Sequence, residues 1–564
     1  MVSNQALIEC VPNFSEGCDL NIIKQITDVI EAVEGVMLLD VDPGKATNRT
    51  VVTFVGHPKQ VIEAAFLAIK KASEIIDMSK HKGEHPRMGA TDVCPLIPVS
   101  NISMEETTMF ANQLANRVGT ELNLPVYLYE HAQPNAARKN LSVIRAGEYE
   151  GFFEKIKLAD WKPDFGPAEM NEKAGATVIG ARDFLIAYNI NLNTKSVRLA
   201  NGVAFDVREA GRVKREGDPI TGKILKDENG EDIRIPGTLK SVKAIGWFID
   251  EYNVAQISMN LTNYKITSVH QAFDEVCRSA QSRGLRVTGS ELVGLIPLSA
   301  MLDAGKHYLQ KQNRSIGVSE AELIHIAVKS LGLDELAPFD PQKKIIEYKL
   351  RNEANERLIG MNLRAFADET ASESPAPGGG SISAYVGSLG AALGTMVANL
   401  SAGKRGWENQ ITFFSNQAAI GQELKAKLLL LVDEDTNAFN KIMLAFGLPK
   451  GNDDEKKART LAIEEATKYA CEVPYLVMET AFATLDLLDA MVKQGNPNSI
   501  TDAGVGVLCI KTTVQGAYYN VMVNAQGLKD RDFAENIKQK AKHILERTTE
   551  RATEILQVVE KAIE

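Results

Sequence analysis

The stretch VMLLDVDPGKATNRTVVTFVGHPKQVIEAAFLAIKKASEII, residues 36–76, contains two β-rich runs followed by a helical repeat. Val36–Val41 and Thr50–Val55 are rich in the residues that strands prefer, so they predict two strands. In Pro58–Ile76, apolar residues recur every three or four positions, which predicts an amphipathic helix. Strands mixed with helices in this way favour an α/β domain, which we expect to extend over residues 1–184.

A second α/β unit is expected over residues 185–350. Its predicted strands are Phe184–Leu192, Lys240–Ile249 and Ala255–Leu261, and its predicted helix is Ser268–Gly284. The run Arg208–Arg234 is charged and glycine-rich, which indicates a surface excursion.

The pattern changes after Tyr348. A short charged stretch within residues 351–358 is expected to be a linker. Long helical periodicity then fills residues 359–564, with predicted helices over 382–400, 407–446, 453–488, 502–525 and 530–563. The expected fold class is therefore multidomain: two α/β (α+β sandwich-like) subdomains followed by an all-α helical bundle.

Composition narrows the function classes. The 564 residues are 44% hydrophobic and 24% charged, and the net charge of −10 argues against a general nucleic-acid binder. The six cysteines are scattered without CxxC spacing, so neither a zinc site nor a disulfide framework is indicated. The start of the chain shows no signal pattern, which favours a cytoplasmic protein. Ile382–Leu400 could cross a bilayer by length, but its Gly, Ala and Ser content favours a close-packed helix and no membrane span.

The run Lys80–Gly89 is the most informative candidate for chemistry. His85 could take up and return a proton near neutral pH, and the neighbouring lysines and arginine could hold an anionic substrate. His81 lies four residues before His85, the spacing of metal ligands on a helix. Gly83 and Pro86 would interrupt such a helix, so no metal site is predicted.

Several long motifs occur in order along the chain. They are ECVPNFSEG (9–17), DMSKHKGEHPRMGATDVCP (77–95), IRAGEYEG (144–151), WKPDFGP (161–167), SPAPGGGS (374–381) and LLLLVDEDTNAF (428–439). With them the chain resembles the glutamate formimidoyltransferase family and, over nearly its whole length, the bifunctional formimidoyltransferase-cyclodeaminase family. The resemblance implies transfer of a formimino group from N-formimino-L-glutamate to N5 of tetrahydrofolate. It also implies closure of 5-formimino-tetrahydrofolate to 5,10-methenyl-tetrahydrofolate with release of ammonia.

The first reaction needs one group that moves protons between two nitrogens, and His85 matches the family's catalytic histidine. Asp42 or Glu84 could orient its ring, and Arg49, Lys82 and Arg87 are candidates to hold the glutamate carboxylates. Two stretches match the family's folate-contacting segments, and their glycines would let backbone approach a flat ligand. Their residues are Gly166, Pro167, Ala168, Glu169, Met170, Asn171, Glu172, Lys173, Ala174, Gly175, Gly237, Thr238 and Leu239.

The second reaction needs an acid, and Asp435 matches the family's cyclodeaminase acid. Helical spacing puts Asp435 on one face with Leu431 and Phe439, where apolar neighbours would raise the pKa of its carboxyl, and it points Asp433 elsewhere. The N–H groups at the start of the helix after SPAPGGGS could accept a carboxylate or a pterin oxygen. The polar turn 495–502 is either a further wall of this site or a simple loop with a helix cap.

Two other functions stay open. In one, the bundle acts only as a cyclohydrolase-like domain; in the other, the chain is a non-catalytic, folate-binding structural oligomer. The presence of both His85 and Asp435 argues against the second. The resemblance further implies polyglutamylated tetrahydrofolate as co-substrate, no metal or nucleotide cofactor, and a ring-like homo-oligomer.

Overall fold

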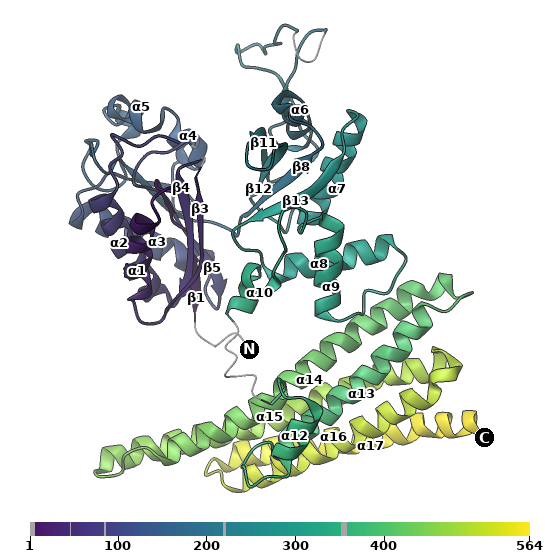
Figure 1. Cartoon of the computed structure of the whole chain (residues 1–564). Coiled ribbons are helices and arrows are strands. Elements are labelled where there is room, and N and C mark those ends of the chain that lie inside the picture. Colours follow the sequence, from purple (N-terminus) through teal and green to yellow (C-terminus); the bar gives the residue numbers. More distant parts are fainter. Residues whose placement is uncertain (1–5, 46, 84–85, 218–221, 351–357) are drawn as a thin grey trace. The chain divides into compact units, whose positions relative to one another are not determined.

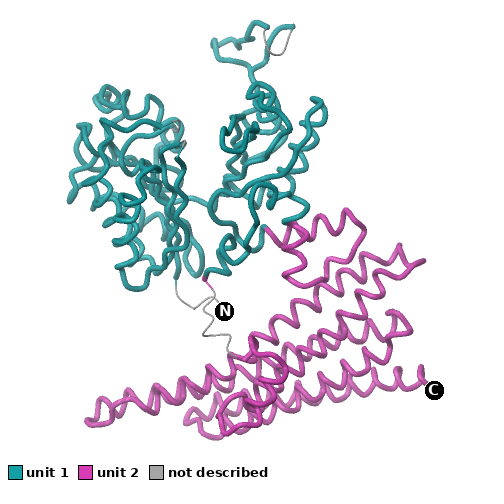
Figure 2. The backbone as a smooth tube through the Cα atoms, in the orientation of Figure 1, with its two compact units in different colours: residues 1–300, 328–349 teal, residues 301–327, 350–564 magenta. Residues whose placement is uncertain are grey.

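The computed structural model describes residues 6–45, 47–83, 86–217, 222–350 and 358–564. Backbone contacts divide the chain into two compact units, shown in different colours in Figure 2. One unit contains Met1–Ala300 and Val328–Lys349, and the other contains Met301–Ala327 and Leu350–Glu564. The domain boundaries expected from the sequence, at residues 184, 350 and 358, stay predictions.

The first unit begins with a mixed sheet. Its strands, in the described residues, run in the order β1-β4-β2-β5-β7-β6, and β3 pairs with β4. The pairs involving β1 to β4 are antiparallel, whereas β7 lies parallel to both β5 and β6. The strands are β1 Leu7–Cys10, β2 Asn13–Phe14, β3 Val36–Gly44, β4 Arg49–Gly56, β5 Thr91–Ser100, β6 Val126–Glu130 and β7 Thr177–Ala181.

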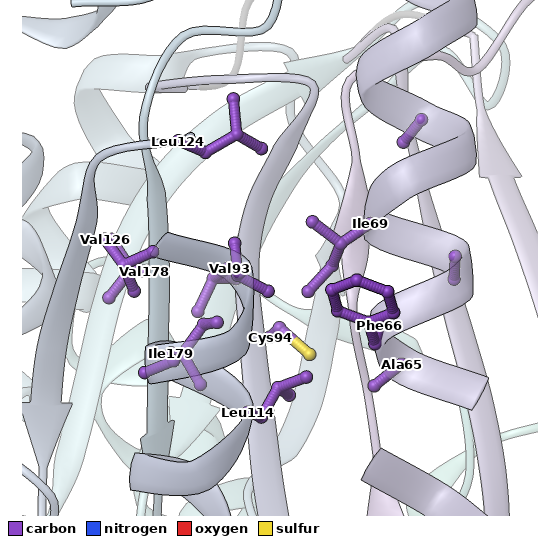
Figure 3. Close-up of a cluster of buried hydrophobic side chains, with 14 of the residues drawn as sticks. Ala65, Phe66, Ile69, Val93, Cys94, Leu114, Leu124, Val126, Val178 and Ile179 are labelled. Carbon is purple, nitrogen blue, oxygen red and sulfur yellow. The ribbon is translucent and has the colours of Figure 1, made fainter. Parts of the chain in front are cut away.

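Helices α1 Leu20–Glu31, α2 Pro58–Ile75 and α3 Met104–Glu121 accompany this sheet (Figure 1). The sequence places Pro58 at the first turn of α2, where its missing N–H costs no hydrogen bond. The apolar face of α2 meets the sheet in a buried cluster that includes Phe66, Ile69, Val93 and Ile179 (Figure 3). The predicted strands and the predicted helix over residues 36–76 are thereby confirmed.

Four short helical elements connect β6 to β7, and they contain residues that contact the flanks of the His85 segment. They are η1 Ala136–Arg138, α4 Leu141–Arg145, α5 Glu148–Lys155 and η2 Ala159–Trp161. Gly147, between α4 and α5, has φ of +96°, a backbone conformation that favours glycine. The IRAGEYEG motif therefore contains the end of α4, a sharp turn and the start of α5.

A second, antiparallel sheet has the order β11-β12-β8-β13. Its strands are β8 Ile186–Leu192, β11 Val242–Ile249, β12 Val254–Leu261 and β13 Val287–Val293, and its helices are α6 Val197–Val207 and α7 Val269–Ser282. The described part of residues 208–234 is exposed or half-buried apart from Gly211, and includes the short pair β9 Arg212–Val213 and β10 Arg234–Ile235. Helices α8 Leu298–Lys311, α9 Glu320–Leu331, α10 Pro341–Lys344 and α11 Ile346–Lys349 follow.

The rest of the described chain is helical. It contains α12 Leu363–Thr370, α13 Gly379–Ala402, η4 Glu408–Gln410, α14 Ile411–Phe446, α15 Asp453–Gln494, η5 Pro497–Ser499, α16 Ile500–Gln526 and α17 Arg531–Ile563. Helices α13 to α17 form a bundle, so the predicted fold class is confirmed. The predicted helix over 407–446 begins with a 3-10 turn, and α15 continues six residues beyond its predicted end at 488.

Helix α13 lies against α14, α15 and α16 through its small residues. A Cβ atom added to Gly387 would come 2.9 Å from Thr513, and one added to Gly394 would come 2.9 Å from Leu487. Among the described residues, α13 is the one helix long and apolar enough to cross a membrane by length and composition, and 61% of its most apolar window is buried. The close-packed helix that the sequence predicts is therefore present.

Candidate active sites

His85 and Glu84 lie outside the described residues, but both flanks of this segment are described. Asn48 fixes the flank before them. Its side-chain Nδ2 donates to the carbonyl of Lys82 at 2.9 Å, and its own carbonyl lies 2.9 Å from Nε2 of His81. A Cβ atom on Gly83 would come 2.4 Å from the carbonyl oxygen of Thr47, so this approach requires glycine. The Thr47-Asn48-Arg49 stretch therefore positions the start of the segment.

Arg87 fixes the flank after them. Its Nη1 donates to Glu148 at 2.8 Å and its Nη2 to Glu150 at 2.7 Å, and these hydrogen bonds raise the pKa of the guanidinium. Its Nε donates to Nδ1 of His81 at 3.3 Å. The guanidinium predicted to hold substrate is thus already engaged by two carboxylates of the IRAGEYEG motif, while its role toward substrate stays a prediction.

The ring nitrogens of His81 both have partners, Arg87 and Asn48. This arrangement fits a neutral ring that accepts at Nδ1 and donates from Nε2. In the described parts of the chain, no group of three His, Cys, Asp or Glu side chains is arranged to hold a metal ion.

Arg49 lies in a buried cluster that the sequence reasoning did not assemble. Its Nε and Nη2 donate to Oδ1 of Asn13 at 2.9 and 2.6 Å, and its Nη1 donates to Asp92. Burial lowers the pKa of Arg49 to about 10, against the opposing effect of Asp92. Asn13, Asp92 and Arg145 are the additional members, and each lies in one of the quoted motifs, which was the available signal.

Two further supporting candidates, Asp42 and Lys82, are among the described residues. Asp42 is half-buried in β3, where it is opposite Val51 of β4. The side chain of Lys82 is exposed, and its carbonyl receives the bond from Asn48. Their predicted roles toward His85 and toward substrate stay predictions.

The first predicted folate segment is joined to both flanks of the His85 segment. The amide of Met78 donates to Lys173, that of Ala90 to Ala174 and that of Ala176 to Met88, at 2.8, 2.8 and 3.1 Å. Gly175 has φ of +72°, and a Cβ there would come 2.3 Å from the carbonyl of Met88. At Gly166 the corresponding distance, to the carbonyl of Leu124, is 2.1 Å. At both glycines the protein's own backbone lies where a side chain would be, so the fold itself requires glycine there, and contact of this segment with folate stays a prediction.

The second predicted folate segment lies at the end of α6. The amides of Thr238 and Leu239 donate to the carbonyls of Asp206 and Val207, each at 3.0 Å. A Cβ on Gly237 would come 2.0 Å from the carbonyl of Arg208, so here too the protein's backbone takes the space of the side chain. Contact of this segment with folate stays a prediction.

In the bundle, Asp435 projects from α14 toward the first turn of α13. Oγ of Ser381 donates to its Oδ2 at 3.0 Å, and a Cβ on Gly380 would come 2.1 Å from Oδ1. Burial raises the pKa of Asp435, and hydrogen bonds from Ser381 oppose that rise. Leu431 is buried whereas Phe439 is 39% exposed. The carboxyl therefore lies against the SPAPGGGS motif, which our helical-face argument did not foresee.

Asp433 has a different environment, as the helical spacing predicts. It is buried, and it accepts from the backbone amides of Leu358 at 2.8 Å and Ile359 at 3.2 Å. Glu434, between them, accepts from the hydroxyl of Tyr469 on α15. The three neighbouring carboxylates thus have three separate sets of partners.

The polar turn 495–502 lies at the other end of α13. The amide of Asn496 donates to Ser401 at 2.8 Å, and Lys404 donates to Asn496 at 3.3 Å. Twenty residues of helix separate Ser381 from Ser401, which is about 30 Å. The reading of this turn as a wall of the Asp435 site was therefore wrong, and the loop-and-cap reading holds.

Comparisons with known proteins agree along the chain. Residues 7–182 match the model of the formiminotransferase domain, N-terminal subdomain, and residues 187–351 match that of the formiminotransferase domain. Residues 362–543 match the model described as formiminotransferase-cyclodeaminase. These matches define the class: folate-dependent formimino-group enzymes.

Whole proteins are also similar. A formimidoyltransferase-cyclodeaminase from Rattus norvegicus is 42% identical over 98% of both chains. A glutamate formimidoyltransferase from Thermoplasma acidophilum is 44% identical over 54% of this chain and 93% of its own. A methenyltetrahydrofolate cyclohydrolase from Methylorubrum extorquens is 40% identical over 31% of this chain and 83% of its own. The chain belongs to the formimidoyltransferase-cyclodeaminase family.

Proposed function

We propose that this protein is a bifunctional enzyme of folate metabolism. It transfers the formimino group of N-formimino-L-glutamate to N5 of tetrahydrofolate. It then converts 5-formimino-tetrahydrofolate to 5,10-methenyl-tetrahydrofolate, and ammonia leaves. The observation that supports this most is the 42% identity over 98% of both chains to a relative whose name states both activities.

In the transfer, His85 is the group that moves protons. N5 must lose a proton as it attacks the amidine carbon, and the glutamate nitrogen must gain one before it leaves, so one imidazole between them serves both steps. The support is the match of His85 to the family motif, together with the way Asn48 and Arg87 hold the two flanks of its segment.

In the ring closure, Asp435 is the acid. N10 attacks the formimino carbon, and the departing nitrogen needs a proton to leave as ammonia. Burial raises the pKa of Asp435, which favours the protonated carboxyl that this role requires. Ser381 and the close approach of Gly380 fix the carboxyl in one orientation.

A second candidate function concerns the bundle alone. The similarity to a methenyltetrahydrofolate cyclohydrolase favours a bundle that hydrolyses the methenyl bridge without releasing ammonia from a formimino group. A non-catalytic oligomer remains the weaker alternative, because both His85 and Asp435 are present.

Tetrahydrofolate, with or without a polyglutamate tail, is the co-substrate in this proposal, and neither a metal nor a nucleotide takes part. The ring closure is a lyase reaction, and the enzyme is a cytoplasmic, ring-like homo-oligomer. Exposed apolar side chains on the bundle support the assembly, among them Leu389 and Leu400 on α13 and Val505 and Leu508 on α16. Sedimentation of the purified chain measures the subunit number.

One purified sample tests the three functions together. With N-formimino-L-glutamate and tetrahydrofolate, the proposed enzyme produces glutamate, methenyl-tetrahydrofolate and ammonia. A transferase with a cyclohydrolase-like bundle produces glutamate and accumulates 5-formimino-tetrahydrofolate without ammonia. A structural folate binder produces none of these, and that result would reject the proposal.

A further inference from the structure

The start of α13 lies next to two polar side chains from neighbouring helices. Asp435 of α14 is on one side, where a Cβ on Gly380 would come 2.1 Å from its Oδ1. Asn520 of α16 is on another side, where a Cβ on Gly379 would come 3.5 Å from its Nδ2. Successive residues of a helix point about 100° apart, so the two side chains lie on adjoining sides of the same turn. Asn520 therefore borders the proposed site of ring closure.

The packing of α16 against α13 places Asn520 there. The hydroxyl of Thr513 donates to the carbonyl of Ser383 at 3.0 Å, and a Cβ on Gly516 would come 2.3 Å from Oγ of Ser383. As α16 proceeds from Thr513 to Asn520, its contacts move toward the start of α13, so the two helices are antiparallel. The position of Asn520 thus follows from the register of two long helices.

A contact one turn beyond Asn520 fixes α16 against α15 as well. Pro474 lies inside α15 and has no N–H, so the carbonyl of Ala470, four residues earlier, receives no hydrogen bond from residue 474. Nδ2 of Asn524 donates to that carbonyl at 2.7 Å. Asn520 is therefore held between one contact to α13 and another to α15.

The amide of Asn520 has hydrogen-bonding groups to spare. Its Nδ2 donates to the carbonyl of Gly516, four residues earlier, at 2.9 Å, and carries a second hydrogen. Among the residues that the structure describes, its Oδ1 has no hydrogen-bond partner. This Oδ1 is also not one of the buried polar atoms that lack a partner, so the protein does not enclose it. The side chain thus offers one acceptor and one donor side by side.

The pterin ring of a reduced folate has a complementary edge. Its lactam carries the N3–H donor and the O4 acceptor next to each other, and an amide side chain can bind such an edge through two parallel hydrogen bonds. O4 lies beside N5, the atom that carries the formimino group. A residue that binds this edge should therefore be near the acid that protonates the departing nitrogen, without taking its place.

We propose that Asn520 binds the lactam edge of the pterin of 5-formimino-tetrahydrofolate, with Oδ1 accepting from N3–H and Nδ2 donating to O4. This rests on the proposed ring-closure function and adds a substrate-binding residue to it. The two hydrogen bonds hold the ring, and with it the formimino carbon, in place while Asp435 supplies the proton.

Two substitutions in the full chain separate this role from a structural one. Asn520→Ser can keep the bond to Gly516, because a serine hydroxyl can donate to the carbonyl four residues earlier. Ser383 makes such a bond to Gly379 at 2.6 Å. The serine side chain is too short to bind the lactam. Asn520→Asp keeps the acceptor for N3–H but loses the donor to Gly516.

The two roles predict opposite orders of damage. For substrate binding, KM for 5-formimino-tetrahydrofolate should rise by about 10- to 100-fold in Asn520→Ser, because both hydrogen bonds to the lactam are lost. The rise in Asn520→Asp should be smaller, below about tenfold, because one of the two remains. For a purely structural role, Asn520→Asp would be the more damaging change.

Asn524→Ser is the matched control, because it makes the same change one turn along the same helix. It removes the contact with Ala470 and should lower the stability of the bundle. KM for 5-formimino-tetrahydrofolate should change less than about threefold, as for a substitution away from the substrate. Formimino transfer by the same chains should stay near wild type in all three variants.

Folate analogues test which edge of the pterin is bound. Tetrahydrofolate and its 4-amino-4-deoxy analogue are compared as inhibitors of ring closure, without glutamate, so that the transferase is idle. The analogue has an amino group in place of O4 and no hydrogen on N3, and the bond to Gly516 prevents Asn520 from exchanging its two groups. Wild type should be inhibited more strongly by tetrahydrofolate. This advantage should disappear in Asn520→Ser and persist in Asn524→Ser.

Several results would overturn the assignment. An Asn520→Ser enzyme that keeps the wild-type KM, or the full advantage of tetrahydrofolate, does so, and so does greater damage in Asn520→Asp than in Asn520→Ser. If wild type closes no ring, the proposed function fails and the assignment of Asn520 fails with it. If wild type closes the ring normally and Asn520→Ser binds substrate as wild type does, only the assignment of Asn520 fails.

Discussion

The flanks of the His85 segment and the surroundings of Asp435 are held in place by different kinds of structure. On the flanks of the His85 segment, loops are joined by side-chain hydrogen bonds between distant parts of the chain, such as Asn48 to Lys82 and Arg87 to Glu148. Around Asp435, two long helices meet, and the first turn of α13 lies against one carboxyl of α14. A loop site depends on many separate contacts, whereas a helical site depends on the register of two elements.

The largest expected effect concerns the loop site. Changing His85 to Ala should lower formimino transfer by about 10²- to 10⁴-fold, because the proton shuttle between two nitrogens is lost. Ring closure of supplied 5-formimino-tetrahydrofolate should persist, since the bundle is unchanged. A His85→Ala enzyme with near wild-type transfer would contradict the assignment of His85 as the proton-transferring group.

The next effect concerns the helical site. Asp435→Asn keeps the size of the side chain but removes the titrating proton, so ammonia release should slow by about 10²-fold or more. Because burial raises the pKa of Asp435, wild-type ring closure should decline as the pH rises through that pKa, and the variant should lack this decline. Ammonia release measured across pH checks both statements.

Asp433→Asn is the matched control for Asp435. Asp433 binds two backbone amides, so its replacement should lower the stability of the bundle by about 1–3 kcal/mol while ring closure stays near wild type. If Asp433→Asn proves the more damaging to ammonia release, the acid has been assigned to the wrong carboxylate.

Gly380 lies against the carboxyl of Asp435, so a substitution there tests the helical site. Gly380→Ala would place a methyl group 2.1 Å from Oδ1 of Asp435, so the carboxyl must shift. Ring closure should fall by about 10- to 100-fold, as for other small displacements of a catalytic group. Gly379→Ala is the control, because its nearest neighbour would be 3.5 Å away, at Nδ2 of Asn520. Equal activity of the two variants would show that Asp435 tolerates displacement.

The smallest effect on activity is expected at Glu9. This carboxyl in β1 is 1% exposed, and burial raises its pKa to about 7, with Arg182 opposing and Glu347 adding to the rise. A raised folded-state pKa means that its stabilising effect is complete below about pH 4.5 and is lost as the pH rises toward 7. Glu9→Gln should therefore be more stable than wild type at pH 8, by up to about 3 kcal/mol, with both activities retained.

Urea unfolding of both proteins at pH 5 and pH 8 measures this difference. The advantage of Glu9→Gln should be present at pH 8 and small at pH 5. An equal difference at the two pH values would mean that Glu9 does not titrate with folding. A loss of transfer would mean that Glu9 has a chemical role, and that a raised pKa marks function in both regions.

The same contrast explains what the sequence could predict. The bundle helices follow from long apolar periodicity, and the direction of the pKa shift of Asp435 was expected from its apolar helix. The position of Asp435 against Gly380 could not be predicted from the sequence, because it depends on how α13 and α14 are aligned. Nor could the sequence show that turn 495–502 lies at the far end of α13.

In the first unit, the strands and α2 follow from local patterns, but the partners of Arg87 and Arg49 do not. Glu148 lies 61 residues from Arg87, and Asp92 lies 43 residues from Arg49. Such pairs depend on the sheet order and on the turn at Gly147, which no single motif reveals. Residue type therefore indicated that cations lie near His85 in the sequence, while only the fold showed that Arg87 and Arg49 already have carboxylate partners.

The central claim is that the two reactions are divided between His85 and Asp435, and one paired time course tests it most directly. His85→Ala and Asp435→Asn are each given N-formimino-L-glutamate with tetrahydrofolate, and separately 5-formimino-tetrahydrofolate, while glutamate and ammonia are measured. The account predicts reciprocal losses: His85→Ala releases ammonia only from 5-formimino-tetrahydrofolate, and Asp435→Asn releases glutamate while 5-formimino-tetrahydrofolate accumulates. A variant that loses both reactions, with its fold intact by circular dichroism, would contradict the division.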